Sequence, residues 1–127
     1  MLYLKRKIDA FLAEWKANPD RKPLIVKGPR QVGKTESIKR FGEMNYQSVI
    51  TINFVEEPKY KMITADGYKA DDIIKNISRM DPSKRFIEGE TLIFFDELQE
   101  FPEIATALKF FKIDGRFDVI CSGSMPV

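Results

Sequence analysis

The sequence predicts an α/β fold in which a parallel sheet is covered by helices on both faces. Segments with helical periodicity alternate with short apolar runs, in the order helix then strand, four times along the chain. The apolar runs are nearly continuous, as is typical of strands in a parallel sheet. The 127 residues are 43% hydrophobic and 31% charged, an ordinary balance for a globular protein. We therefore predict a single domain over residues 1–127.

The first half of the chain contains two predicted helices and two predicted strands. Residues 3–17 have apolar side chains at three- and four-residue spacing, which predicts a helix. The run PLIVK predicts a short buried strand, and KTESIKRFG predicts a helix that ends at Gly42. The β-branched run SVITINF predicts a second strand. Residues 55–67 are polar, and we expect a loop there.

The second half repeats the alternation. KADDIIKNISRM predicts a helix whose buried side is formed by Ile73, Ile74 and Ile77. TLIFFDE is the most apolar predicted strand, and Pro102 suits the first turn of a helix through PEIATALKFFK. FDVICSGS predicts the fourth strand.

Composition excludes several classes of function. The chain has no His, which rules out His-based catalysis and His zinc sites. A single cysteine, Cys121, excludes an internal disulfide and fits a reducing compartment, and the charged N-terminus is neither a signal peptide nor a membrane span. We therefore expect a cytoplasmic protein. The net charge of +2 and the absence of a basic stripe do not support nucleic-acid binding.

Residues 28–35, GPRQVGKT, fit the phosphate-loop (Walker A) pattern G-x-x-x-x-G-K-[ST] between a predicted strand and a predicted helix. Glycines allow backbone N–H groups to converge on phosphate, and the following helix directs its N-terminus at the same anion. We expect Lys34 to reach the β- and γ-phosphates and Thr35 to ligate Mg²⁺. The alternatives are an ordinary glycine-containing turn and, for Arg30, a solvent-facing side chain. The predicted nucleotide-binding residues are Gly28, Pro29, Arg30, Gln31, Val32, Gly33, Lys34, Thr35 and Glu36.

An acidic pair follows the third predicted strand, in the manner of a Walker B motif. Asp96 lies at the carboxyl end of that strand, where ligands bind in open α/β sheets, and it can support Mg²⁺. The adjacent Glu97 can activate a water molecule; the alternative is a solvated pair that caps the strand. Ser122 and Ser124, at the tip of the fourth strand, either contact the γ-phosphate or simply end the strand. Gln99 either orients Glu97, faces a partner or is solvated.

These residues favour an ATPase. The chain lacks the N-K-x-D motif for guanine and an arginine-rich lid, and a small-molecule kinase has no use for the Glu after the strand Asp. Our first hypothesis is Mg²⁺-dependent hydrolysis of ATP, with Glu97, Lys34, Ser122 and Ser124 in catalytic roles and Thr35 and Asp96 at the metal. The second is an interaction module that binds ATP and hydrolyses it negligibly on its own. A kinase that transfers phosphate to an acceptor is the third.

With GPRQVGKT, TLIFFDELQ and GRFDVICSGS, the whole chain resembles the prokaryotic AAA-type P-loop ATPases that usually carry a C-terminal domain of unknown function. Ser122 stands where Thr is commoner. The resemblance implies a P-loop fold of the additional-strand type, with sheet order 1-4-3-2 and a fifth strand beyond the first. That strand and the C-terminal domain are missing after SMPV, so we expect an N-terminal fragment of a longer protein. The strand PLIVK would then lie at an open edge, from which we expect either self-association into a homo-oligomer or marginal stability.

Overall fold

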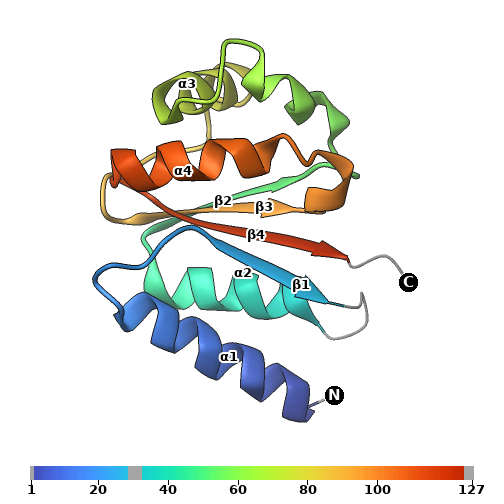
Figure 1. Cartoon of the computed structure of the whole chain (residues 1–127), viewed down its shortest axis with the longest axis vertical. Coiled ribbons are helices and arrows are strands. Elements are labelled where there is room, and N and C mark those ends of the chain that lie inside the picture. Colours follow the sequence, from blue (N-terminus) through green and yellow to red (C-terminus); the bar gives the residue numbers. More distant parts are fainter. Residues whose placement is uncertain (1, 29–32, 125–127) are drawn as a thin grey trace.

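A computed structural model describes residues 2–28 and 33–124 and shows a three-layer α/β fold (Figure 1). Helices α1 and α2 lie on one face of a central sheet, and α3 and α4 lie on the other (Figure 1). This arrangement confirms the predicted fold class and the alternation of helices and strands. The elements are α1 (Leu2–Ala17), β1 (Leu24–Gly28), α2 (Lys34–Asn45), β2 (Ser48–Asn53), the 3₁₀ helix η2 (Pro58–Thr64), α3 (Ala70–Met80), β3 (Thr91–Asp96), the 3₁₀ helix η3 (Leu98–Glu100), α4 (Ile104–Asp114) and β4 (Asp118–Ser124).

The described strands form one parallel sheet in the order β1-β4-β3-β2, which confirms the predicted order 1-4-3-2. The register aligns the carboxyl ends of all four strands. Val26 of β1 pairs with Ser122 of β4, Ser122 pairs with Asp96 of β3, and Asp96 pairs with Asn53 of β2. Strands β1 and β4 continue for two residues beyond this row, to the pair Gly28 and Ser124. The polar residues that follow the apolar runs therefore meet along one edge of the sheet.

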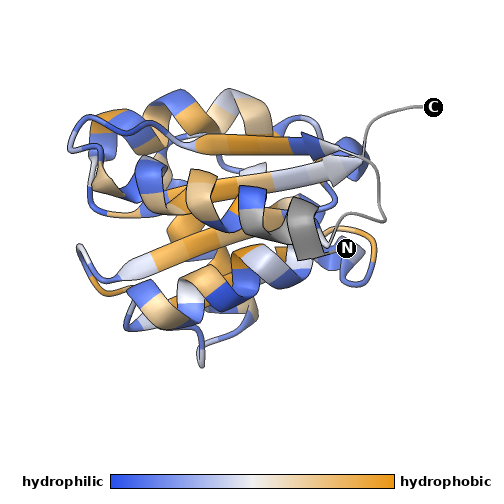
Figure 2. Ribbon diagram, turned by 90° about the horizontal axis from the view of Figure 1, so that it is seen from below, coloured by the Kyte–Doolittle hydropathy of each residue, from blue (hydrophilic) through white to orange (hydrophobic). Residues whose placement is uncertain are grey.

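Two hydrophobic cores hold the three layers together. All six residues of β3 are buried, because helices cover both of its faces. The strands are correspondingly apolar along most of their length in Figure 2. The core between the sheet and α1 and α2 consists of Leu12, Ile38, Phe41, Tyr46, Leu92, Phe94 and Ile120. The larger core on the other face is built around Ile52, Ile73, Ile77, Phe95, Ile104, Phe111 and Val119.

Strand β1 is less buried than its apolar sequence predicts. Among the described strands it pairs only with β4 and forms an edge of the sheet. Leu24 and Val26 pack against the core of α1 and α2, whereas Ile25 on the opposite face is 38% exposed and Lys27 is also exposed. The prediction of a strand is correct, but the prediction of full burial is wrong because one face of β1 has little cover.

Three further local predictions are corrected. Helix α2 does not end at Gly42 but continues to Asn45. Residues 55–67 are not only a loop, because they contain η2, which buries Tyr60 and Ile63. Pro102 precedes α4 by two residues rather than lying in its first turn.

Candidate functional site

The candidate site lies at the carboxyl edge of the sheet, between the tips of β3 and β4 and the start of α2. A cavity of about 280 Å³ is lined by Gly33, Lys34, Thr35, Glu36, Asp96, Glu97 and Ser124. A second cavity of about 420 Å³ shares four of these residues and extends towards the end of β2. The structure thus brings together residues from three of the predicted motifs, which are separated by up to about ninety positions in the sequence.

The start of α2 is shaped to receive an anion. Gly33 immediately precedes the helix with φ 71° and ψ 27°, a left-handed conformation that favours glycine, and none of the described side chains caps the helix. Backbone N–H groups in the first turn of a helix have no partner within the helix and attract negative charge. The phosphate loop itself stays a prediction, because residues 29–32 lie outside the described residues.

Lys34 is buried although it carries a charge. Its side chain folds back so that Nζ donates a hydrogen bond to the carbonyl oxygen of Gly28 at 2.9 Å, which links the start of α2 to the end of β1. Such burial is unfavourable for an ammonium group unless anionic or polar partners surround it. Lys34 therefore holds positive charge next to the cavity at the helix start.

Thr35 and Asp96 form a direct pair across the site. The Thr35 hydroxyl donates to Asp96 Oδ2 at 3.0 Å, and the backbone N–H of Glu97 donates to Asp96 Oδ1 at 2.9 Å. Asp96 is only 4% exposed. Burial raises the pKa of its carboxyl group above the ordinary value, although the hydrogen bonds from Thr35 and from the Glu97 amide act in the opposite direction.

This pair is suited to a hard cation. A hydroxyl and a carboxylate oxygen are ligands that Mg²⁺ prefers, and Mg²⁺ commonly takes only one or two protein ligands besides water and phosphate. No group of three or more His, Cys, Asp or Glu side chains suitable for a metal ion occurs among the described residues. The donor set therefore fits a magnesium ion held jointly with phosphate better than an ion held by the protein alone.

Glu97 has an unusual backbone conformation. Its φ of 63° makes it the one residue other than glycine with positive φ in the described part of the chain. This conformation costs roughly 1–2 kcal/mol for a residue with a Cβ, and such strain tends to occur at functional sites. The Gln99 side chain lies beside Glu97, and its Nε2 donates to Glu97 Oε2 at 2.9 Å. Of the three readings of Gln99, the structure thus favours contact with Glu97.

The two serines of β4 occupy different environments. Ser124 lines the cavity beside Lys34 and Thr35. Ser122 is 1% exposed, pairs in register with Asp96, and its hydroxyl has no hydrogen-bond partner among the described residues. The structure therefore brings Ser124 to the candidate site and leaves Ser122 buried in the sheet behind it.

The remaining predicted residues divide into two groups. Gly28 is buried at the end of β1, and Glu36 lines both cavities. Pro29, Arg30, Gln31 and Val32 lie outside the described residues.

Sequence reasoning missed the side of the site formed after β2. Asn53 ends this strand, and its Oδ1 accepts hydrogen bonds from the backbone N–H groups of Val55 and Glu56 at 2.8 and 3.0 Å. This turn brings an acidic pair to the second cavity, whose wall includes Lys39, Thr51, Asn53, Glu56 and Glu57. The signal was present as polar residues directly after the SVITINF run.

Comparisons with known proteins agree with the fold. A family model described as an AAA domain matches residues 20–127. The solved structure of PCH-2 from C. elegans has a TM-score of 0.51 and 12% sequence identity, and the alignment covers 98% of this chain and 35% of PCH-2. At this identity the likeness concerns the fold, and the chain spans about a third of the length of that protein. No curated protein matches the chain. In the described residues, no helix has the length and apolar character needed to cross a membrane.

Proposed function

This chain belongs to the AAA-domain family of nucleotide-binding, ATPase-type modules, and we propose that it binds ATP with Mg²⁺ and hydrolyses the bond between the β- and γ-phosphates. The observation that carries the proposal is the Thr35–Asp96 pair, which places a hydroxyl and a carboxylate beside a buried lysine and the start of a helix. Residues 1–127 form one AAA-type domain in this proposal. A C-terminal domain and assembly with further copies, which the family resemblance implies, belong to the same proposal.

Binding is assigned to the start of α2. Lys34 and the first-turn N–H groups of α2 hold the β- and γ-phosphates by charge-assisted hydrogen bonds. Thr35 and Asp96 hold Mg²⁺, and a bound Mg²⁺ ion supplies positive charge that offsets the charge of the phosphate oxygens. Ser124 donates its hydroxyl to the γ-phosphate, because it is the β4 serine that lines the cavity.

Hydrolysis is assigned to Glu97. A water oxygen forms a bond to the γ-phosphorus while the bond from that phosphorus to the bridging oxygen breaks, and the bridging oxygen keeps the electron pair as part of ADP. The Glu97 carboxylate accepts the proton that the water loses. The position of Glu97 beside Asp96, at the wall shared by both cavities, supports this role.

The test compares Lys34→Ala and Glu97→Gln with the parent chain, by calorimetry for ATP binding and by phosphate release for turnover. Lys34→Ala should weaken ATP binding by about tenfold or more, because it removes charge-assisted hydrogen bonds of roughly 1.5–3 kcal/mol each. Glu97→Gln keeps the shape of the side chain and should retain binding while turnover falls about 10²–10⁴-fold.

Lys75→Ala and Glu43→Gln are the matched controls, because both side chains are exposed on helices away from the two cavities. Unchanged affinity in a folded Lys34→Ala variant would show that the cavity is not a phosphate site. Tight ATP binding without phosphate release in the parent would instead identify the nucleotide-dependent interaction module. Phosphate transfer to an added acceptor would identify a kinase.

A further inference from the structure

Gln99 uses both ends of its amide in contacts with two different elements. Its Nε2 donates to Glu97 Oε2 at 2.9 Å, and its Oε1 accepts the backbone N–H of Ser124 at 3.1 Å. A carboxylate can only accept and a backbone N–H can only donate, so the chemistry at each end fixes the orientation of the amide. The Gln99 amide therefore links Glu97, after β3, to Ser124, at the tip of β4, in one defined orientation.

Gly123 provides the space for this side chain. A Cβ atom at position 123 would lie 3.1 Å from Gln99 Oε1 and 3.3 Å from Leu98 Cβ, closer than ordinary van der Waals contact. Gly123 does not have a positive φ, so its backbone angles do not require glycine. The close approach of Gln99 and Leu98 instead leaves little room for a Cβ atom at this position.

The backbone of Glu97 is held separately from its side chain. Its N–H is bound to Asp96 Oδ1, and its φ is fixed at 63° by the turn into η3. The side chain extends from this anchored point along the wall of the cavity. The contact with Gln99 restricts the direction of the Glu97 carboxylate. Gln99 is in turn bound to β4 by the hydrogen bond from the Ser124 N–H.

We propose that Gln99 is a positioning residue that holds the Glu97 carboxylate at a fixed place relative to the tip of β4. This inference rests on the proposed role of Glu97 as the base that activates water. Proton transfer depends strongly on geometry, and a displacement of about 1 Å can lower a rate by about 10²-fold. Gln99 itself is not assigned any contact with ATP, so a change that keeps its acceptor for Ser124 N–H should affect turnover and not affinity.

The kinetic test uses Gln99→Glu and Gln99→Met. Gln99→Glu keeps the length and the acceptor for Ser124 N–H but places a second carboxylate against Glu97, whereas Gln99→Met removes both polar contacts at similar size. Each should lower kcat by about tenfold or more. For Gln99→Glu, KM for ATP and the calorimetric affinity should stay within about twofold of the parent. Glu100→Gln, the neighbouring exposed side chain, should change none of these values.

Gly123→Ala tests the same contact from the opposite side. The added methyl group should displace the Gln99 amide and reproduce the loss in kcat. Gly123→Ala changes the position of the Gln99 amide but leaves its donor and acceptor groups intact. Because Gly123 has no side chain that could contact the nucleotide, this variant tests the position of Gln99 alone.

A second measurement detects the contact without turnover, through the melting temperatures of Glu97→Gln, Gln99→Glu and the double variant. Gln99→Glu should lower the melting temperature, because two carboxylates face each other. The double variant exchanges donor and acceptor and should recover most of that loss, while its turnover stays as low as that of Glu97→Gln. Purely additive effects of the two substitutions would show that the side chains do not interact and would overturn the inference.

The remaining outcomes separate this inference from the function on which it rests. Turnover that depends on Glu97 but is unchanged in both Gln99 variants would overturn the role of Gln99 alone. A parent without phosphate release, or turnover that Glu97→Gln leaves intact, would overturn the proposed hydrolysis and the role of Gln99 in it together.

Discussion

Asp96 illustrates how a residue with a proposed role in binding can lower the stability of the fold. It is buried, and burial raises the pKa of its carboxyl group above the ordinary value of 3.8. The folded protein therefore binds more protons than the unfolded chain just above pH 3.8, and the stability from this group falls as the pH rises through that region. Above this region, burial of the ionised carboxylate opposes folding in the absence of a bound cation.

Asp96→Asn should accordingly stabilise the protein in the absence of nucleotide and Mg²⁺. The amide can accept the Glu97 N–H through its oxygen and donate to the Thr35 hydroxyl, so both contacts are retained without the charge. A gain of about 1 kcal/mol would raise the melting temperature at pH 7 by roughly 4 °C, and the difference from the parent should disappear below about pH 4.

Thermal melts at both pH values check this prediction, with the exposed Glu43→Gln as control. A lower melting temperature for Asp96→Asn at pH 7 would mean that the ionised carboxylate stabilises the fold by itself. The same variant should lose the Mg²⁺ dependence of ATP binding if Asp96 supports the metal.

The residue types of the site and the edge of the sheet at which they meet were predictable from the sequence, but the contacts of individual side chains were not. Lys34, Thr35, Asp96 and Glu97 belong to motifs whose chemistry can be read directly. The choice between Ser122 and Ser124 needs the direction of each side chain at the end of β4, which the run CSGS does not specify. The contacts of Gln99 needed the distance to a backbone group on another strand.

At the scale of elements, helix α2 shows why local signals can mislead. A glycine near the end of an amphipathic segment predicts a C-terminal cap. Gly42 instead lies inside α2, where a Cβ atom would be 2.9 Å from Val49 Cγ2 and 3.1 Å from Leu92 Cδ2. The glycine allows α2 to approach β2 and β3 closely, a tertiary requirement that the local sequence does not reveal.

Gly42→Ala should therefore destabilise the protein despite the better helix propensity of alanine. The propensity gain is about 1 kcal/mol, and overpacking against a stiff β-branched side chain costs roughly 1–3 kcal/mol. We expect a net loss of about 1 kcal/mol, or a melting temperature lower by roughly 4 °C. Gly42→Ala should destabilise a Val49→Ala variant less than it destabilises the parent, because Val49→Ala removes the methyl groups that clash. A stabilised Gly42→Ala variant would show that the helix moves away from the sheet at little cost.

The segment after β2 was misjudged for a related reason. Residues 55–67 are mostly polar, and an apolar pair three residues apart is a weak signal for a helix. Tyr60 and Ile63 are nevertheless almost fully buried, because η2 packs on α3. Short 3₁₀ segments of this kind depend on what they pack against rather than on their own periodicity.

At the scale of the whole molecule, the strand order depended on resemblance to a known family and not on any local pattern. Pairing of β1 with β4 joins residues almost a hundred positions apart, and no short stretch of sequence encodes it. The sequence predicted which segments become strands, since each is a compact apolar run. It did not predict that β1 would have one exposed face, because this follows from its position in the sheet.

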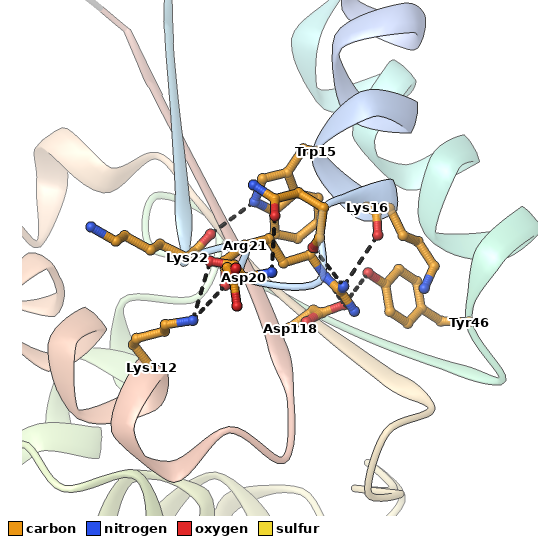
Figure 3. A network of polar contacts seen from close by, with 9 residues as sticks. Trp15, Lys16, Asp20, Arg21, Lys22, Tyr46, Lys112 and Asp118 are labelled. Carbon is orange, nitrogen blue, oxygen red and sulfur yellow. Dashed lines mark hydrogen bonds and ion pairs between the residues drawn. The ribbon is translucent and has the colours of Figure 1, made fainter.

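Figure 3 shows a polar network that links α1 on one face of the sheet and α4 on the other to the start of β4. Because β4 begins at Asp118, this network lies at the end of the sheet opposite the candidate site. Asp118 Oδ2, at the start of β4, accepts hydrogen bonds from Arg21 Nε and Nη2 at 3.0 and 2.8 Å and from the Tyr46 hydroxyl at 2.5 Å. Arg21 also donates to the carbonyl oxygen of Lys16 in α1, and Lys112 of α4 donates to the carbonyl oxygen of Arg21. The contact with Asp118 raises the pKa of Arg21, and burial raises the pKa of Tyr46, so both donors keep their protons.

Asp118→Ala should consequently lower the stability of the whole domain without changing the nucleotide site. The substitution leaves a partly buried arginine and a buried tyrosine without their shared acceptor. We expect a loss of about 2 kcal/mol and a melting temperature lower by roughly 8 °C. Asp9→Ala is the matched control, because the Asp9–Arg40 ion pair is about 40% exposed on both sides and should contribute less than about 1 kcal/mol.

Calorimetry below the melting temperature should give the same ATP affinity for both variants as for the parent, since the network lies at the amino ends of the strands and the proposed site at their carboxyl ends. Equal melting temperatures for the two variants would mean that the Asp118 network stabilises the fold no more than the exposed Asp9–Arg40 ion pair does. A marked loss of ATP affinity in folded Asp118→Ala would instead show that the two ends of the sheet are coupled.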